Sequence, residues 1–140
     1  MHSYAVNVWE EAGSFWSSCE DIPEAHSAGD TLEDLLRHAA EGLQLALSIY
    51  VDQLRPIPEA SPAKDGQHVI HQPALVEAKI ALWNAMRDKG MRKADLCRLL
   101  SAAQTKVDRL LDFEHSSKIE QVELALAALG KRLAVSVEAA

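Results

Sequence analysis

Residues 92–118, RKADLCRLLSAAQTKVDRLLDFEHSSK, are the stretch that decides how the chain is organised. Leu96 and Leu100 lie four residues apart in its first half. Val107 and Leu111 have the same spacing in its second half, so the pattern predicts two short helices that each present an apolar stripe. The small residues SAA between them allow a tight turn in which the helices cross. The stretch therefore predicts either a helix-turn-helix or a plain helical pair with a solvated polar face.

The second predicted helix has a polar face that suits the major groove of DNA. On a helical wheel, Thr105, Arg109 and Asp112 project away from the apolar side. Gln can bind adenine and Arg guanine through two hydrogen bonds each, and the N–H groups at a helix start attract phosphate. The candidate base contacts are Gln104, Thr105 and Arg109, and the candidate phosphate contacts are Lys106, Ser116, Ser117 and Lys118. For Ser117 and Lys118, helix capping is the alternative.

The composition is that of a globular protein with a core. Of the 140 residues, 48% are hydrophobic and 25% are charged. No stretch is apolar enough to predict a membrane span, and the N-terminus shows no signal peptide. The chain has two cysteines, Cys19 and Cys97, which lie far apart in the sequence and in different settings. They do not suggest a disulfide scaffold. We therefore expect a cytoplasmic protein in a reducing compartment.

The net charge of −7 is unevenly distributed along the chain. Residues 1–66 carry 12 Asp/Glu and 3 Lys/Arg, whereas residues 67–140 carry 9 and 11. This asymmetry indicates two halves with different kinds of partner. Because the second half is only mildly basic, its phosphate contacts would be few, and a dimer would double them.

The N-terminal half predicts a small antiparallel sheet. Residues 4–9 and 14–19 alternate in polarity as strands do, with a turn between them where Gly13 can take a positive φ. A short extended piece is expected at residues 25–28. Residues 68–72 are expected to return to the same sheet as a last short strand.

One long helix is expected to cover this sheet. Apolar residues recur at helical spacing through about residue 52. Asp30 is the expected cap, in a capping box with Glu33, and Thr31 is the alternative cap one position later. One helix on a small antiparallel sheet gives a two-layer α+β unit.

We place a domain boundary near residue 72, giving domains 1–72 and 73–140. The segment 55–67 is rich in proline and is expected to be a linker-like loop. Pro73 suits the first turn of a new helix, and Gly90 suits its end. The C-terminal domain is thus predicted to be all-helical.

The end of the chain predicts a helix and then a strand. The helix runs from about 118 to 129 and ends at Gly130. Residues 131–137 then alternate in polarity, and a lone exposed strand is a liability in a folded protein. We therefore expect this strand to pair with its copy in a second subunit through Leu133, Val135 and Val137.

The acidic residues of the first half do not predict a nuclease. A two-metal site needs several carboxylates that converge, and none lies inside a predicted strand. A solvated or partner-facing surface is the favoured interpretation, and neither catalysis nor a cofactor is expected. His68 and His71 fall on opposite faces of a strand, so no metal site is expected there. The carboxylates at strand ends and in loops are Glu10, Glu11, Glu20, Asp21 and Asp30.

Two motifs in the same chain resemble the HicB antitoxin family. CEDIPEAHSAGDTLEDLLRHAAEGLQLAL, followed by RPIPEAS, resembles the family's loop-and-helix stretch and its proline-rich exit. RLLDFEHSSKIEQVELALAALGKRL is similar to the end of the longer, DNA-binding HicB proteins. GDTLEDLL and ALGKRL occur in the family's order and spacing, and the resemblance covers nearly the whole chain.

The resemblance implies an antitoxin with two domains. The first would be a partial ribonuclease-H-like domain that binds the small HicA toxin, an mRNA ribonuclease. The second would dimerise and repress the toxin–antitoxin operon as a DNA-binding helix-turn-helix domain. An acidic first half would give electrostatic complementarity to a basic, RNA-handling toxin. The residues expected to face the toxin are Glu20, Asp21, Glu24 and Asp30.

The chain departs from this family in the turn of the predicted motif. Ser101 stands where Gly is frequent, and Ala102 and Ala103 stand where Val and Ser are frequent. Loss of the Ser cap should destabilise the second helix by about 1 kcal/mol, unless Ser101 caps it instead. Asp108 also adds a negative charge near the expected DNA-facing side.

A second interpretation from another class is a stand-alone helix-turn-helix regulator whose N-terminal domain senses a small ligand. The neighbouring reading frame discriminates between the two. A small basic protein encoded there favours the antitoxin, and its absence favours the regulator.

Overall fold

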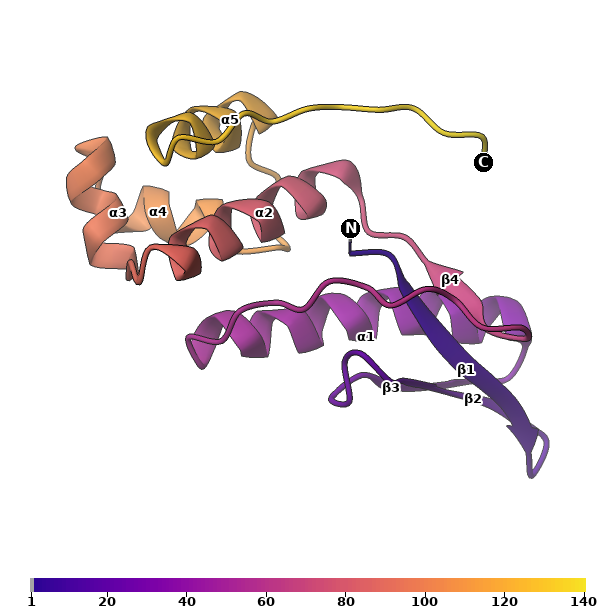
Figure 1. Cartoon of the computed structure of the whole chain (residues 1–140). Helices are drawn as coiled ribbons and strands as arrows, with labels where there is room; N and C mark the ends of the chain where they lie inside the picture. The colour runs from indigo at the N-terminus through magenta and orange to yellow at the C-terminus, as the bar shows by residue number, and fades with distance from the viewer. Residues whose placement is uncertain (1) are drawn as a thin grey trace. The chain divides into compact units, whose positions relative to one another are not determined.

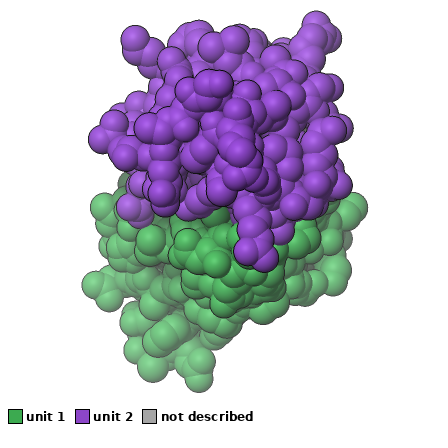
Figure 2. Space-filling model, turned by 90° about the vertical axis from the view of Figure 1, so that its left-hand side faces the viewer, with its two compact units in different colours: residues 1–77 green, residues 78–140 purple. Residues whose placement is uncertain are grey.

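The computed structural model describes residues 2–140 and contains four strands and five helices in that range (Figure 1). The chain divides into two compact units, residues 1–77 and residues 78–140 (Figure 2). All four strands belong to the first unit. The last three helices, α3 (Lys93–Leu100), α4 (Gln104–Leu110) and α5 (Ile119–Ala128), belong to the second. The predicted α+β class is therefore confirmed.

The first unit is built on an antiparallel sheet with strand order β3-β2-β1-β4. The strands are β1 (Tyr4–Glu11), β2 (Ser14–Cys19), β3 (His26–Gly29) and β4 (His68–Ile70). β4 comes back after a long segment without helix or strand and pairs antiparallel with the start of β1. The predicted strands are thus present, with β3 shifted by one residue.

β1 is longer than predicted and carries two carboxylates. Glu10 pairs with Phe15 and Glu11 with Ser14, so the ladder continues up to the turn. The prediction that no acidic residue lies inside a strand was therefore wrong. The reason is the two-residue turn, because Ala12 and Gly13 both have positive φ (53° and 78°). Such turns match the twist of the strands and let them pair to the last residue.

Helix α1 (Leu32–Asp52) begins one residue later than the favoured prediction. Its N-cap is Thr31, whose Oγ accepts a hydrogen bond from the Asp34 N–H at 3.1 Å. The Thr31 carbonyl oxygen accepts from the Leu35 N–H at 2.9 Å, which is the first bond of the helix. Asp30 is consequently outside the helix, and the alternative cap is the correct one.

Helix α1 covers one face of the sheet (Figure 1). Leu35, Leu43 and Leu47 of the helix are fully buried, as is Tyr4 of β1. The helix approaches β3 so closely that a Cβ on Gly29 would lie 2.5 Å from the Leu35 backbone nitrogen. This close approach fixes the start of α1 against the end of β3.

The opposite face of the sheet carries two exposed tryptophans. Trp9 of β1 and Trp16 of β2 are directly paired across the strands. Their side chains alternate with the buried ones, since neighbouring strand residues point to opposite faces. They are 43% and 40% exposed, so a large aromatic surface remains open on this face.

Helix α2 (Ala74–Asp88) starts in the first unit and continues into the second. It is followed by α3 (Lys93–Leu100), α4 (Gln104–Leu110) and α5 (Ile119–Ala128). Figure 1 shows these helices in succession. The second unit has a core in which the following side chains are almost completely buried: Trp83, Leu96, Val107, Leu110 and Val122.

The two predicted helices, α3 and α4, are present on either side of the turn 101–103. The alternative that Ser101 caps the second of them is wrong. Ser101 ends α3 in the left-handed conformation (φ 50°), and the Ala102 N–H donates to the Cys97 carbonyl oxygen at 3.0 Å. Ala103 is the N-cap of α4 and makes no side-chain capping bond. Ser101 therefore caps the end of α3, and α4 starts without a side-chain cap.

Residues 131–140 contain neither helix nor strand. The predicted strand at 131–137 is thus absent from the single chain, because a strand needs a hydrogen-bonded neighbour and no described segment supplies one here. Val135 and Val137 are 79% and 95% exposed. Within residues 2–140, no helix is long and apolar enough to cross a membrane.

Candidate nucleic-acid interface and acidic surface

An open groove of about 490 Å³ lies on the second unit between α4 and the segment that leads into α5. It brings together six of the seven residues predicted to contact DNA, while Gln104 is exposed at the start of α4 outside its lining. The six residues are Thr105, Lys106, Arg109, Ser116, Ser117 and Lys118. Residues from two separate elements therefore converge on one surface.

The wall formed by α4 follows from its apolar stripe. Val107 and Leu110 are buried in the core of the second unit, so Lys106 and Arg109 are turned to the outside, and both are exposed. Among residues 2–140, neither of these cations nor Lys118 forms an ion pair. No acidic residue lines the groove. The groove is therefore cationic and open to an anion.

The second wall is the loop that ends in Lys118. Ser117 Oγ donates a hydrogen bond to the Arg109 carbonyl oxygen at 3.2 Å and lies 3.0 Å from His115 Nδ1. Ser117 thus fastens the loop to α4 and does not cap α5. Lys118 holds the N-cap position of α5 but makes no side-chain capping bond, and its side chain is exposed. Ser116 is exposed as well.

Beneath the groove lies Lys79 of α2, a residue that the sequence analysis missed. Its side chain is fully buried. Its Nζ donates to three carbonyl oxygens, those of Arg109 at 2.9 Å, Asp112 at 2.7 Å and His115 at 2.7 Å. Burial lowers the pKa of Lys79, and the nearby Asp112 carboxylate opposes that shift. The sequence does indicate that Lys79 is buried, because it lies between Val76 and Ile80 on the apolar stripe of α2.

The negative charge of Asp108 is compensated within the second unit. Asp108 lies on α4 but outside the lining of the groove. Its Oδ1 forms an ion pair with Lys93 Nζ at 3.3 Å, at the start of α3. The expected repulsion of phosphate by Asp108 is thus weakened by a cation that comes from the preceding helix.

Three of the four acidic residues predicted to face a partner make contacts inside the first unit. Glu20 pairs with Lys64 Nζ at 3.1 Å. Asp21 accepts hydrogen bonds from the N–H and the Oγ of Ser61, at 2.9 and 2.7 Å. Both residues therefore hold the segment 55–67, which has no helix or strand.

Glu24 has a similar internal contact at the end of α1. It accepts a hydrogen bond from the Tyr50 hydroxyl at 2.8 Å and lies 3.5 Å from Arg55 Nη1. Burial, and next the bond to Glu24, raises the pKa of Tyr50. Glu24 therefore has a structural role whether or not it also faces a partner.

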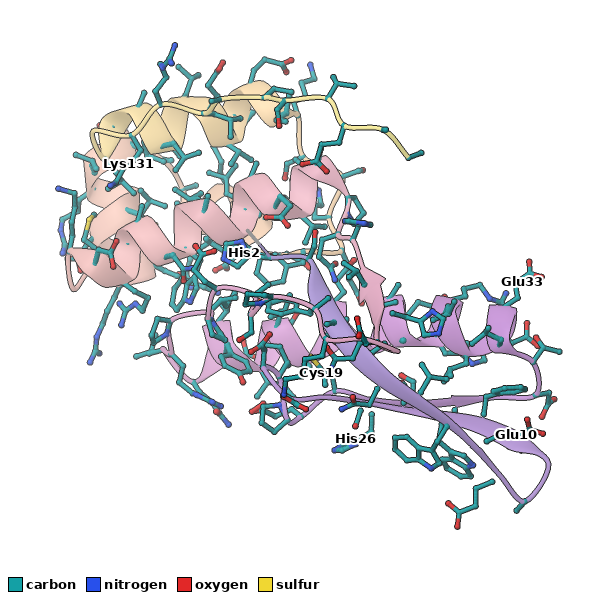
Figure 3. All side chains as sticks on the ribbon, turned by 45° about the vertical axis from the view of Figure 1, so that its right-hand side comes forward. His2, Glu10, Cys19, His26, Glu33 and Lys131 are labelled. Carbon is teal, nitrogen blue, oxygen red and sulfur yellow. The ribbon has the colours of Figure 1, made fainter. Side chains whose placement is uncertain are left out.

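Asp30 is the exception among these acidic residues. It is exposed and has no ion pair or hydrogen bond from its side chain within residues 2–140. It lines a hollow of about 300 Å³ together with Trp16, Asp34 and Arg37. Other exposed carboxylates of the unit, Glu10 on the β1–β2 hairpin and Glu33 at the start of α1, point outward in Figure 3.

The end of the chain leaves apolar side chains uncovered. Leu124 on the outer side of α5 is 66% exposed. It lines a shallow hollow together with Leu133 and the two cations Lys131 and Arg132, and Figure 3 labels Lys131 just after α5. Beyond this point Val135 and Val137 are exposed, and neither lies in a strand.

Comparisons with known proteins agree on one family. A family model described as "HicB_like antitoxin of bacterial toxin-antitoxin system" matches residues 3–81. An antitoxin HicB of Pseudomonas fluorescens is 50% identical over 141 residues, which cover 100% of this chain and 97% of that protein. An antitoxin HicB 2 of Photorhabdus laumondii is 38% identical, covering 81% and 80%. An antitoxin HicB of Escherichia coli K12 is 32% identical, covering 88% and 89%.

Proposed function

The chain belongs to the HicB-like antitoxins of bacterial toxin–antitoxin systems, and on this basis we propose that it neutralises a HicA-type toxin and represses its own operon. The toxin would be an mRNA ribonuclease bound by domain 1–72, a partial ribonuclease-H-like fold. Domain 73–140 would bind operator DNA as a dimer. The observation that supports DNA binding best is the groove with three cations that have no ionic partner among residues 2–140.

In this proposal α3 and α4 form a helix-turn-helix. α4 would be the recognition helix, since its outer side is polar while Val107 and Leu110 anchor it to the core. Gln104, Thr105 and Arg109 would reach base edges in the major groove. The phosphate contacts would be Lys106, Ser116, Ser117 and Lys118. Ser117 would contribute least, because its hydroxyl already donates to the Arg109 carbonyl oxygen and its N–H to that of His115.

DNA binding is tested with the Arg109→Ala variant. Loss of a base contact by Arg109 should weaken binding by about 1–3 kcal/mol, which is about 5–150-fold. Fluorescence anisotropy with a duplex from the region upstream of the gene measures this change. The matched control is Arg37→Ala, which removes the same charge from the exposed surface of the first unit. Equal affinity of the Arg109→Ala variant and the parent would refute this assignment.

For the toxin we propose the face of the sheet that α1 leaves open. It offers Trp9 and Trp16, and the hollow beside Trp16 contains Asp30, whose side chain has no partner within the part of the chain that the structure describes. Glu20, Asp21 and Glu24, at the opposite end of β2 and β3 from Asp30, would add a second group of acidic contacts. Aromatic side chains are enriched at protein interfaces, and opposite charges would steer a basic toxin toward this unit.

Toxin binding is tested by co-purification with the small protein encoded in the neighbouring reading frame. Asp30→Asn should lower the affinity, because it removes a negative charge that would attract a basic toxin. The fold should stay intact, because the Asp30 side chain makes no hydrogen bond or ion pair within residues 2–140. Glu41→Gln, an equally exposed change on α1, is the matched control and should leave the affinity unchanged. No complex with the parent chain would exclude the proposed division of labour.

Dimerisation would use the terminal segment. Leu133, Val135 and Val137 alternate as strand residues do, and two copies could pair through this segment. Val135→Asp should then shift the protein toward monomer in sedimentation velocity, whereas a dimer that survives this change must use another surface.

A further inference from the structure

We propose that Lys79 is the positioning residue of the DNA-binding groove. It does not reach the groove surface, because its side chain is fully buried. Its ammonium group instead joins the end of α4, through the Arg109 carbonyl oxygen, to the loop 111–118, through those of Asp112 and His115. One buried cation therefore holds both walls of the groove from below.

The three hydrogen bonds that Lys79 Nζ donates require the charged form of its side chain. An ammonium group has three N–H donors, and three carbonyl oxygens lie within 2.7–2.9 Å of Nζ. A neutral amine has only two donors, so one of the three carbonyl oxygens would lose its bond to Nζ and keep only its backbone donor. A buried charge is tolerated only when polar groups compensate it. Here the three carbonyl dipoles do so, and one belongs to the last turn of α4, where a cation is favoured.

The position of Lys79 explains why the groove has a defined width. The last carbonyl groups of a helix have no partner within the helix, and α4 is only seven residues long. Besides the Asp112 N–H at 3.3 Å, the Arg109 carbonyl oxygen accepts from two side chains, Lys79 Nζ from the core and Ser117 Oγ from the opposite wall. Arg109 on one wall and Lys118 on the other are thus held at a spacing that Lys79 determines.

The functional consequence rests on the proposed DNA binding. If the loop 111–118 is no longer held against α4, the cations that line the groove are displaced and cannot contact a phosphate or base. Replacement of Lys79 by Met keeps the length and the apolar stem and removes all three donors. We expect the folded Lys79→Met protein to bind the upstream duplex about tenfold more weakly, the loss typical of one arginine contact. The matched control is Lys89→Met in the exposed turn just after the same helix, with an expected change of less than about twofold.

The measurement must separate positioning from simple stability. Affinities are compared at a temperature where circular dichroism shows that both variants are folded. A folded Lys79→Met protein with the parent's affinity would overturn the proposal, since Lys79 would then only stabilise the unit. The expected result is weaker binding together with amide chemical-shift changes at residues 109–118 and around position 79, and not elsewhere.

A second arm uses the intact parent chain and does not depend on any variant being folded or on DNA. Lysine labelled with ¹⁵N should give one ammonium signal that exchanges slowly with water at neutral pH. Among the ammonium groups of residues 2–140, Lys79 is the one that is fully buried. No slowly exchanging ammonium signal would overturn the proposal. If this signal is present but the parent does not bind the duplex, the proposed operator binding fails while the positioning contact stands.

A third arm restores the ammonium group. Lys79→Cys in a background of Cys19→Ala and Cys97→Ala is alkylated with bromoethylamine while unfolded, which gives thialysine at position 79, and is then refolded. Thialysine carries the same three donors on a chain of the same length. Recovery of the affinity lost by the unmodified Cys variant supports the proposal. Recovery of thermal stability without recovery of affinity contradicts it.

Discussion

Replacing Ala103 with Ser should stabilise the second unit by supplying the missing cap of α4. Ala103 has the extended backbone of an N-cap residue (φ −67°, ψ 153°) but no group that can accept a hydrogen bond. A Ser Oγ at this position can accept from the N–H of the second or third helical residue, Thr105 or Lys106. The Lys106 N–H already donates to the Ala103 carbonyl oxygen at 3.1 Å. Thr105 is therefore the more useful donor.

The size of the effect follows from these contacts. An N-cap Ser in place of Ala is worth about 0.5–2 kcal/mol. The position is exposed, and one of the two candidate N–H groups is already bonded, so we expect the lower half of that range, about 0.5–1 kcal/mol. For a unit of this size such a gain raises Tm by about 2–8 °C.

Urea denaturation followed by circular dichroism measures this gain. The matched control is Ala128→Ser, the same substitution at the exposed end of α5. Ser is a poorer helix former than Ala and has no free N–H to cap there, so this control should be neutral or slightly destabilising. An Ala103→Ser protein that is no more stable than the parent would show that α4 does not begin at Gln104.

Two further predictions concern the first unit. Gly29→Ala should destabilise it by about 1–3 kcal/mol, because the new Cβ would lie 2.5 Å from the Leu35 backbone nitrogen. In the control Gly42→Ala, the atom nearest to the new Cβ is the movable Ser27 hydroxyl oxygen. Denaturation of this control should therefore show a clearly smaller loss of stability. Burial raises the pKa of Tyr4 and of Tyr50 above the ordinary value of 10.0, so the folded state keeps these protons longer than the unfolded chain does. The free energy of unfolding should be unaffected by these groups below pH 10 and should fall as the pH rises above it. Tyr50→Phe should reduce that fall above pH 10; an unchanged pH dependence would exclude this origin.

Local patterns were sufficient to predict most of the fold from the sequence. Period-two alternation located β1 and β2, and helical spacing located α1 through residue 52. The start of α1 was harder, because Asp30 and Thr31 are both good caps. Only the backbone geometry decides between them, and Thr31 has the extended conformation (φ −127°) and the bond to the Asp34 N–H.

Features that depend on distant contacts could not be predicted in the same way. Nothing near Lys79 in sequence reveals that the carbonyl groups of Arg109, Asp112 and His115 will surround its ammonium group. Likewise Glu20 and Asp21 looked free for a partner, but Lys64 and Ser61, some 40 residues later, bind them. The alternation of residues 131–137 predicts a strand, but no described segment of residues 2–140 pairs with it.

The most direct test of the central claim is a two-readout experiment in cells that express the toxin from the neighbouring reading frame. Growth reports neutralisation, and a reporter behind the upstream region of the gene reports repression. The account predicts that the parent chain restores growth and represses the reporter, whereas Arg109→Ala still restores growth but loses repression. Failure of the parent to restore growth, or full repression by Arg109→Ala, would contradict it.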